Sequence, residues 1–244
     1  MHVAVERLTK RFGRVLALDD VNLQVEPGRI VDVLGSNGAG KTTLLRCLAG
    51  ILSPTEGSVR YDGEVLRRDR LDLRRRFGFL ADSPFIDRGM TPIQHVSMAL
   101  RLYGADREGV ERTVVDLFRR FDLLAVAEGS VGTLSRGQWY KAALVALLAV
   151  DPEVWLVDEP FASGMDPRGI AVFRERAEEA AVRGRTVFYS TQILDVAERF
   201  SDLVAILHEG KLVAFDSLDG LGHRVQNEDD VLEQIFANLR PEEP

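Results

Sequence analysis

The sequence predicts an α/β fold, in which helices cover a mostly parallel sheet and a smaller antiparallel β region lies beside it. Short apolar runs that suit buried strands alternate with segments of helical periodicity, which is typical of a parallel sheet. The first thirty residues alternate polar and apolar positions instead, as half-buried antiparallel strands do. Residues 92–150 are mainly helical and interrupt the alternation, so they predict an inserted helical part.

The predicted elements follow one another in a clear order. After the antiparallel strands of residues 1–30, residues 30–34 form a β-branched run that ends at a glycine, and residues 41–52 have an apolar helical face. Apolar residues recur at helical spacing in 110–121 and in 138–150. Further buried strands are expected at 154–157, 186–190 and 203–207. A chain of 244 residues with no Gly/Ser-rich or Pro-rich linker has room for one large domain.

The composition indicates a globular protein and argues against several functions. Hydrophobic residues make up 45% and charged residues 28%, and the net charge of −7 gives no general attraction to nucleic acid, so none is expected as a partner. The longest apolar run, 142–150, is shorter than the roughly 20 residues that span a bilayer. The first residues lack the apolar stretch of a secretory signal, and Cys47 has no second cysteine to pair with. We therefore expect a cytoplasmic protein.

Residues 35–42, GSNGAGKT, match the phosphate-binding pattern G-x-x-x-x-G-K-[ST]. Its glycines let the backbone curl so that successive N–H groups point at phosphate oxygens. Lys41 brings positive charge to the β- and γ-phosphates, and the Thr42 hydroxyl can bind Mg²⁺. The pattern follows a predicted strand and opens a predicted helix, whose N-terminus also favours anions. The sequence therefore predicts a nucleoside triphosphate site.

A second chemical motif is the apolar run 154–157, which is followed directly by Asp158 and Glu159. A strand that ends in two carboxylates can hold Mg²⁺ through the first and polarise an attacking water through the second, as a general base. Alone, this pattern also fits the start of a solvated loop. Beside a phosphate loop, it favours catalysis.

The segment Leu134-Ser135-Arg136-Gly137-Gln138 closely resembles the LSGGQ signature of ABC-type ATPases. A predicted helix over 139–150 separates it from Asp158, as in that family. The resemblance extends over nearly the whole chain, since residues 163–166 (SGMD) match the family's D-loop and Phe12 stands where the family places an aromatic ring that stacks on adenine. Residues 206–211 and 231–236 look like the tail of export-type transporter ATPases.

The resemblance implies a P-loop NTPase parallel-sheet core, an antiparallel β subdomain and an inserted α-helical signature subdomain. Within a single domain of residues 1–244, it places the core and the antiparallel region at 1–82 and 153–215. The helical signature subdomain would occupy 83–152, and a C-terminal tail would occupy 216–244.

The resemblance also implies ATP and Mg²⁺ as cofactors and assigns the residues of the site. Glu159, Gln192 and Lys41 would act in catalysis, and Thr42, Asp82 and Asp158 would bind Mg²⁺. The residues expected to bind the nucleotide are Phe12, Ser36, Asn37, Gly38, Ala39, Gly40, Lys41, Thr42, Thr43, Ser135, Gly137 and Gln138.

A phosphate loop and a signature on separate lobes of one chain cannot contact the same nucleotide, so two chains are expected to pair head to tail. Ser135 and Gly137, at a helix N-terminus, would close over the γ-phosphate held by the other chain's Lys41. The resemblance further implies a membrane permease on a separate chain, docked at Asp82 and residues 83–94. The protein would then be peripheral on the inner face of the cell membrane, as a homodimer or as a heterodimer with another ABC ATPase.

Three positions outside the signature depart from the family's pattern. Asp82 stands in the loop that usually carries Gln or Glu, and its shorter side chain affects its reach to Mg²⁺. Gln192 replaces the histidine expected after the late strand, and this change predicts slower hydrolysis. Asp32 occupies a position where glycine is common, and a carboxylate there needs a partner.

The residues leave three functions open. The leading one is the ATPase subunit of an ABC transporter, with export favoured. A soluble ABC ATPase that acts on ribosomes or DNA would resemble either two such domains in one chain or one domain split by a long coiled coil, and the sequence shows neither. A nucleotide-gated module that dimerises with ATP but hydrolyses little is suggested by Gln192.

Overall fold

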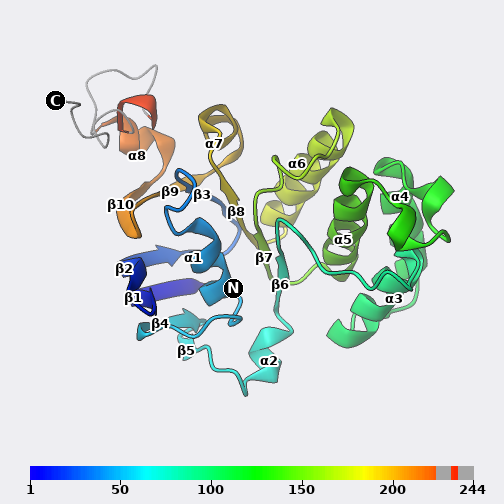
Figure 1. The fold of residues 1–244 in the computed structure, drawn as a ribbon, viewed down its shortest axis with the longest axis horizontal. Helices are drawn as coiled ribbons and strands as arrows, with labels where there is room; N and C mark the ends of the chain where they lie inside the picture. The colour runs from blue at the N-terminus through cyan, green and yellow to red at the C-terminus, as the bar shows by residue number, and fades with distance from the viewer. Residues whose placement is uncertain (224–231, 236–244) are drawn as a thin grey trace.

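A six-stranded sheet forms the centre of the protein in a computed structural model, which describes residues 1–223 and 232–235 (Figure 1). In spatial order its strands are β10 (Lys211–Asp216), β9 (Leu203–His208), β3 (Ile30–Leu34), β8 (Thr186–Thr191), β7 (Val154–Val157) and β6 (Phe77–Leu80). The strands from β9 to β6 run parallel, and β10 pairs antiparallel with β9 at one edge. The predicted parallel core is confirmed.

The antiparallel strands predicted in the first thirty residues form two of the four strands of a second sheet, and its other two strands were not predicted. Its order is β2 (Val15–Val25), β1 (Val3–Phe12), β4 (Glu56–Tyr61) and β5 (Glu64–Val65). Buried side chains of this sheet share one hydrophobic cluster with helix α1 (Lys41–Leu48) and with Val31 and Val33 of β3. Alternate residues of β3 thus face the second sheet, while Ile30 packs on the opposite side of the central sheet with the helices there.

The inserted helical part lies beside β6 and consists of α3 (Pro92–Tyr103), α4 (Val110–Arg120) and α5 (Arg136–Val150), with 3₁₀ turns at Leu124–Val126 and Val131–Thr133 (Figure 1). Every residue of α5 from Tyr140 to Val150 is buried. A helix that is buried on all sides needs apolar residues all round, which explains the continuous apolar run at its end.

Further helices are α2 (Leu71–Arg74), α6 (Pro167–Val182), α7 (Leu194–Phe200) and α8 (Leu218–Gly222). Aromatic rings of Phe161, Phe173, Tyr189 and Phe200 pack edge to face or tilted between α6, α7 and β8. Across the described part of the chain, no helix combines the length and apolarity that a bilayer crossing requires.

The structure changes several predicted element bounds. The helix expected over 41–52 ends at Leu48, since Gly50 takes a left-handed φ of 62°. The helix expected from 138 begins at Arg136. Strand β6 lies where the sequence indicated only a loop. The subdomain limits 1–82, 83–152, 153–215 and 216–244 stay predictions, and of the predicted tail segment 231–236 only 232–235 fall among the described residues.

Candidate active site

The phosphate loop connects β3 to α1, and its glycines are required by close backbone contacts. A Cβ on Gly35 would lie 2.5 Å from the carbonyl oxygen of Leu207. Gly40 has a φ of 109°, and a Cβ there would lie 2.7 Å from the carbonyl oxygen of Ala17. Gly38 also has a left-handed φ, of 85°. The loop conformation therefore depends on three positions that favour glycine.

Lys41 lies at the start of α1 with its side chain 5% exposed. Its ammonium donates hydrogen bonds to the carbonyl oxygens of Gly35 (2.8 Å) and Ser36 (3.2 Å). It also forms an ion pair with Glu159, with Nζ 3.1 Å from Oε1. The positive charge expected at the phosphates is thus held between the loop and the expected general base.

Asp158 follows β7 and is buried among hydroxyl groups. Thr42 Oγ1 donates to Asp158 Oδ1 over 3.1 Å, and Ser190 Oγ donates to the same oxygen over 2.7 Å. Ser190 Oγ also accepts a hydrogen bond from the Glu159 backbone N–H (2.9 Å). Ser190, which lies on β8, therefore positions both carboxylate residues. Sequence reasoning missed this role, because a single serine in an apolar strand gives no pattern.

Glu159 has a left-handed backbone, with φ 48°, which turns the chain sharply after β7. Burial raises the pKa of its carboxyl group, while Lys41 acts in the opposite direction. Its second oxygen, Oε2, is buried and has no hydrogen-bond partner among the described residues. A carboxylate with one free buried oxygen is suited to accept a proton.

The side chains gather around a cavity of about 300 Å³. It is lined by Ala17, Ser36, Asn37, Gly38, Gly40, Lys41, Thr42, Thr43, Asp82 and Glu159. Nine of these ten were expected from the sequence, and Ala17 of β2 was missed because a small residue in a strand carries no signal of its own. Ala39 of the loop is buried and does not line the cavity, and Asp158 lies behind Thr42.

The oxygen atoms at this site suit Mg²⁺ bound together with phosphate, rather than a metal ion whose ligands all come from the protein. The Thr42 hydroxyl and the Asp158 carboxylate lie side by side, with Asp82 on the cavity wall. Within residues 1–223 and 232–235, no group of three or more His, Cys, Asp or Glu could hold a metal ion. Mg²⁺ in phosphate sites takes one or two carboxylates and completes its shell with phosphate and water.

The signature residues do not line this cavity, and they are fixed by contacts of their own. Ser135 caps α5 in a reciprocal arrangement with Gln138: Ser135 Oγ accepts from the Gln138 N–H (3.2 Å), and Gln138 Oε1 accepts from the Ser135 N–H (3.0 Å). A Cβ on Gly137 would lie 2.4 Å from the carbonyl oxygen of Gly164 in the D-loop. The signature and the D-loop of one chain are therefore in direct contact.

Three other positions singled out from the sequence, Phe12, Gln192 and Asp32, do not line the phosphate cavity. Phe12, at the end of β1, is 46% exposed, and Lys10 Nζ lies 5.2 Å from its ring centroid. Gln192 follows β8 and is exposed. Asp32 is fully buried with neither oxygen hydrogen-bonded to a described residue, and burial raises the pKa of this carboxyl well above its usual value. The partner that Asp32 was expected to need is not found in the described part of the chain.

Comparison with known proteins decides the family. Residues 18–162 match the family model described as ABC transporter. The chain belongs to the ABC transporter family. A curated relative of this family, the ABC-type transporter ATP-binding protein EcsA of Bacillus subtilis, is 30% identical over 99% of this chain and 97% of its own length. The ABC transporter ATP-binding protein NatA of the same organism is 32% identical over 92% and 90%.

Solved structures agree with this ABC assignment. A structure described as the ATP-binding subunit of an ABC transporter has a TM-score of 0.92 and 29% identity, and covers 98% of this chain and 99% of its own. The dimeric cassette MJ0796, bound to ADP and phosphate after hydrolysis, has a TM-score of 0.76 and 26% identity, over 88% and 98%. As an ABC ATPase, this chain binds and hydrolyses ATP for a transporter.

Proposed function

We propose that this ABC ATPase binds ATP with its phosphates in the Lys41 cavity and its adenine on Phe12. The observation that carries this proposal is that Lys41, Thr42 and Glu159 line one cavity of about 300 Å³, with Asp158 hydrogen-bonded to Thr42 behind it. Ser36, Asn37, Gly38, Ala39, Gly40 and Thr43 contribute the backbone and hydroxyl groups of the loop. Half of the Phe12 surface is free for stacking, with the cation of Lys10 nearby.

Thr42 and Asp158 would hold Mg²⁺, with Asp82 as a further ligand. When bound, the ion supplies positive charge that stabilises the phosphates as the γ-phosphoryl group is transferred. Thr42 would turn its hydroxyl lone pair to the ion, while Ser190 keeps its hydrogen bond to Asp158.

Glu159 acts as the general base in this proposal, and Lys41 moves from the carboxylate to the phosphates when ATP binds. The attacking water would lose its proton to Glu159, whose raised pKa makes it a better acceptor than an ordinary glutamate. Gln192 would donate a hydrogen bond to the γ-phosphate without the charge of the family's histidine.

Hydrolysis would require two chains, paired head to tail. Ser135, Gly137 and Gln138 are absent from the phosphate cavity of their own chain but lie at the N-terminus of a fifteen-residue helix, which favours anions. The Ser135 hydroxyl accepts within the cap and keeps its proton for the other chain's γ-phosphate. The dimeric form of the relative MJ0796 supports the pairing of two chains.

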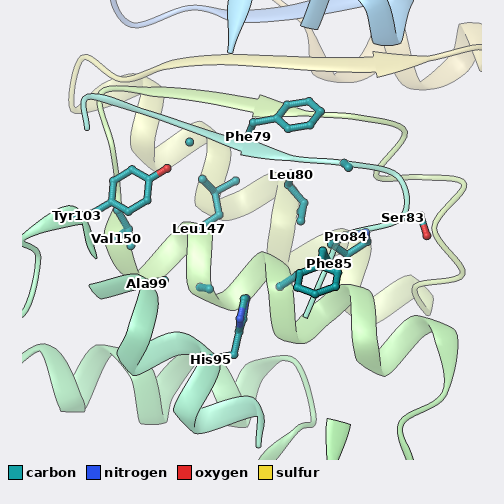
Figure 2. A pocket seen from close by; sticks show the side chains of 14 residues that line it. Phe79, Leu80, Ser83, Pro84, Phe85, His95, Ala99, Tyr103, Leu147 and Val150 are labelled. Atoms are coloured by element: carbon teal, nitrogen blue, oxygen red, sulfur yellow. The ribbon is translucent and has the colours of Figure 1, made fainter. Parts of the chain in front are cut away.

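A membrane permease would dock in an apolar groove of about 410 Å³ between β6, α3 and α5, shown in Figure 2. Phe79, Leu80, Leu147 and Val150 form its apolar wall, and Ser83, Pro84 and Phe85 follow β6 along its rim. Phe85 is 89% exposed. Such an exposed ring beside an apolar groove is typical of a protein interface. Docking there would hold the chain at the inner face of the membrane.

We favour export over import. The relatives include the daunorubicin resistance protein DrrA3 of Streptomyces coeruleorubidus, which is 32% identical, and the Nod factor export ATP-binding protein I of Burkholderia pseudomallei, which is 31% identical. A sulfate/thiosulfate import protein of Rhizobium meliloti is 33% identical, so identity alone does not decide direction.

The test is a Glu159→Gln substitution, which keeps ATP binding and removes the base. We expect the purified variant to lose ATP hydrolysis and to form a dimer with ATP and Mg²⁺ in light scattering, while the wild type hydrolyses ATP and returns to monomers. A variant that stays monomeric at saturating ATP would contradict the head-to-tail dimer.

A further inference from the structure

Arg136 and Asp82 join the signature to the phosphate cavity within a single chain. Arg136 Nη2 lies 3.5 Å from Asp82 Oδ1. Asp82 lies two residues beyond β6 and lines the phosphate cavity, whereas Arg136 is the first residue of α5, between Ser135 and Gly137. The side chain of a signature residue thus reaches the wall of its own chain's site, although the neighbouring backbone is placed for the other chain.

Both partners of this ion pair replace residues of the family's pattern. Arg136 stands at a glycine of the LSGGQ signature, and Asp82 stands where Gln or Glu is usual. The two replacements have opposite charges and meet in space. A glycine at position 136 could not make this contact, so the ion pair is specific to chains with this combination.

The ion pair is exposed enough to break and reform. The side chains are 68% exposed for Arg136 and 46% for Asp82, and ion pairs at such positions are weak. In the same helix Lys141 is only 6% exposed and pairs with Asp166 at the shorter distance of 2.9 Å, so its ammonium has less freedom to move than the Arg136 guanidinium. Arg136 is therefore the cation near the start of α5 that can change partners.

We propose that Arg136 exchanges Asp82 of its own chain for the γ-phosphate held by the other chain when ATP binds. The inference rests on the proposed function, in which Asp82 turns to Mg²⁺ and the signature closes over the second nucleotide. Once Asp82 has turned away, the guanidinium is released at a helix N-terminus that faces the other chain. Its planar set of donors matches phosphate oxygens in pairs.

This exchange makes occupancy of one site promote closure over the other. Asp82 cannot pair with Arg136 and bind Mg²⁺ at the same time. Nucleotide bound in one chain therefore frees the Arg136 of that chain, which can then contact the γ-phosphate held by the other chain. One substitution should then have two effects of opposite sign. Arg136→Gln should favour Mg·ATP binding to the monomer and should weaken the ATP-bound dimer.

The experiment uses the full chain with Glu159→Gln as parent and compares it with the parent carrying Arg136→Gln. The affinity for Mg·ATP is measured with a fluorescent ATP at protein concentrations where light scattering shows only monomers. We expect Arg136→Gln to tighten Mg·ATP binding about two- to five-fold, since a weak surface ion pair no longer competes. The tightening should disappear when EDTA replaces Mg²⁺.

The dimer is measured separately by light scattering at saturating Mg·ATP. We expect Arg136→Gln to raise the dimer dissociation constant at least tenfold, which is typical for the loss of a charged hydrogen bond, and Arg136→Lys to recover part of it. The matched control is Arg101→Gln, which removes the exposed pair between Arg101 of α3 and Asp106 just beyond that helix (4.0 Å) and should change neither quantity.

Parallel changes of both quantities, or no change in either, would overturn the exchange while leaving the ATPase function intact. Failure of the Glu159→Gln parent to dimerise would overturn both. Circular dichroism on each variant detects misfolding and so separates it from these outcomes. We expect folded variants, because a surface substitution of this kind changes stability little.

Discussion

Lys41 Nζ lies 3.1 Å from Glu159 Oε1, with the two side chains 5% and 15% exposed. Lys41, which should neutralise the phosphates, is therefore paired with Glu159, which should accept the proton. When a phosphate takes the lysine, Glu159 loses the charge that opposes the rise of its pKa. Substrate binding then prepares the base, and this relation suggests the first prediction.

Lys41→Met should abolish ATP hydrolysis and lower the free energy of unfolding, because Glu159 keeps a buried carboxyl without its cation. In a double-mutant cycle with Glu159→Gln, the second substitution should recover part of this loss, with a coupling of about 0.5–3 kcal/mol. Urea denaturation of the four proteins measures it. Additive effects would mean that the ion pair contributes nothing to stability.

Gly137→Ala should destabilise the chain by about 1–3 kcal/mol, since its Cβ would lie 2.4 Å from the Gly164 carbonyl oxygen. It should also weaken ATP-driven dimerisation, because the signature and the D-loop would move apart. The matched control is Gly129→Ala in the same helical part, where the nearest atom to a new Cβ is at 3.5 Å. Equal melting temperatures for both variants would contradict the packing role.

Asp166→Asn should lower stability at pH 7 but not at low pH. Asn keeps the N-cap of α6, where Asp166 Oδ1 accepts from the Gly169 N–H at 2.7 Å, and removes only the charge that pairs with Lys141. The hydrogen bond from Lys141 lowers the pKa of Asp166 in the folded chain.

A depressed folded pKa stabilises the fold above the unfolded pKa of about 3.9, and this contribution is lost as the pH falls through the folded value. The difference between wild type and Asp166→Asn in urea unfolding should therefore be present at pH 7, shrink below about pH 4 and vanish at lower pH. A pH-independent difference would assign the effect to packing.

Gln192→His should raise the rate of ATP hydrolysis about 3- to 12-fold with unchanged ATP affinity. The histidine adds positive charge and a rigid reach to the γ-phosphate, and half of a charged hydrogen bond, taken as about 1.5–3 kcal/mol, converts to that range. Steady-state hydrolysis by the purified protein checks it. An unchanged or lower rate would show that Gln192 substitutes for histidine without cost, or that a partner chain supplies this group.

Phe85→Asp should impair binding to the permease and leave hydrolysis by the isolated chain intact. The ring is 89% exposed at the apolar groove, so its loss should not unfold the protein. Val182→Asp is the control, because Val182 is 90% exposed on α6, outside the groove residues. Co-purification with a candidate permease distinguishes the two variants, and equal recovery of both would place the docking site elsewhere.

The sequence predicts the parts of this fold that have a period or a motif. The alternation in residues 1–25, the apolar run of β3 and the periodicity of α4 and α5 correspond to real elements, because each places one face against a core. Strand β6 carries no such signal: it is four residues long and contains Gly78, where a Cβ would lie 2.4 Å from Leu147 of α5. Its glycine packs against the end of a leucine side chain that is distant in sequence.

The residues of the site also fall into those that a motif reveals and those that only the fold brings together. The phosphate loop and Asp158-Glu159 can be found because their chemistry fixes both residue type and spacing. Ala17, Ser190 and the contact of Arg136 with Asp82 cannot, since they depend on which strands and loops the topology brings together. Asp32 illustrates the opposite case: the sequence marks it as unusual, and the structure gives it no hydrogen-bond partner among the described residues.

The reciprocal cap at the start of α5 also affects how fast two chains can associate. Ser135 and Gln138 hold one another before any nucleotide arrives, so the conformational entropy of ordering this helix end is lost during folding and not during encounter. A preorganised surface docks without a slow rearrangement of its own. The rate of closure would then depend on diffusion and on the nucleotide, without a delay from ordering this helix end.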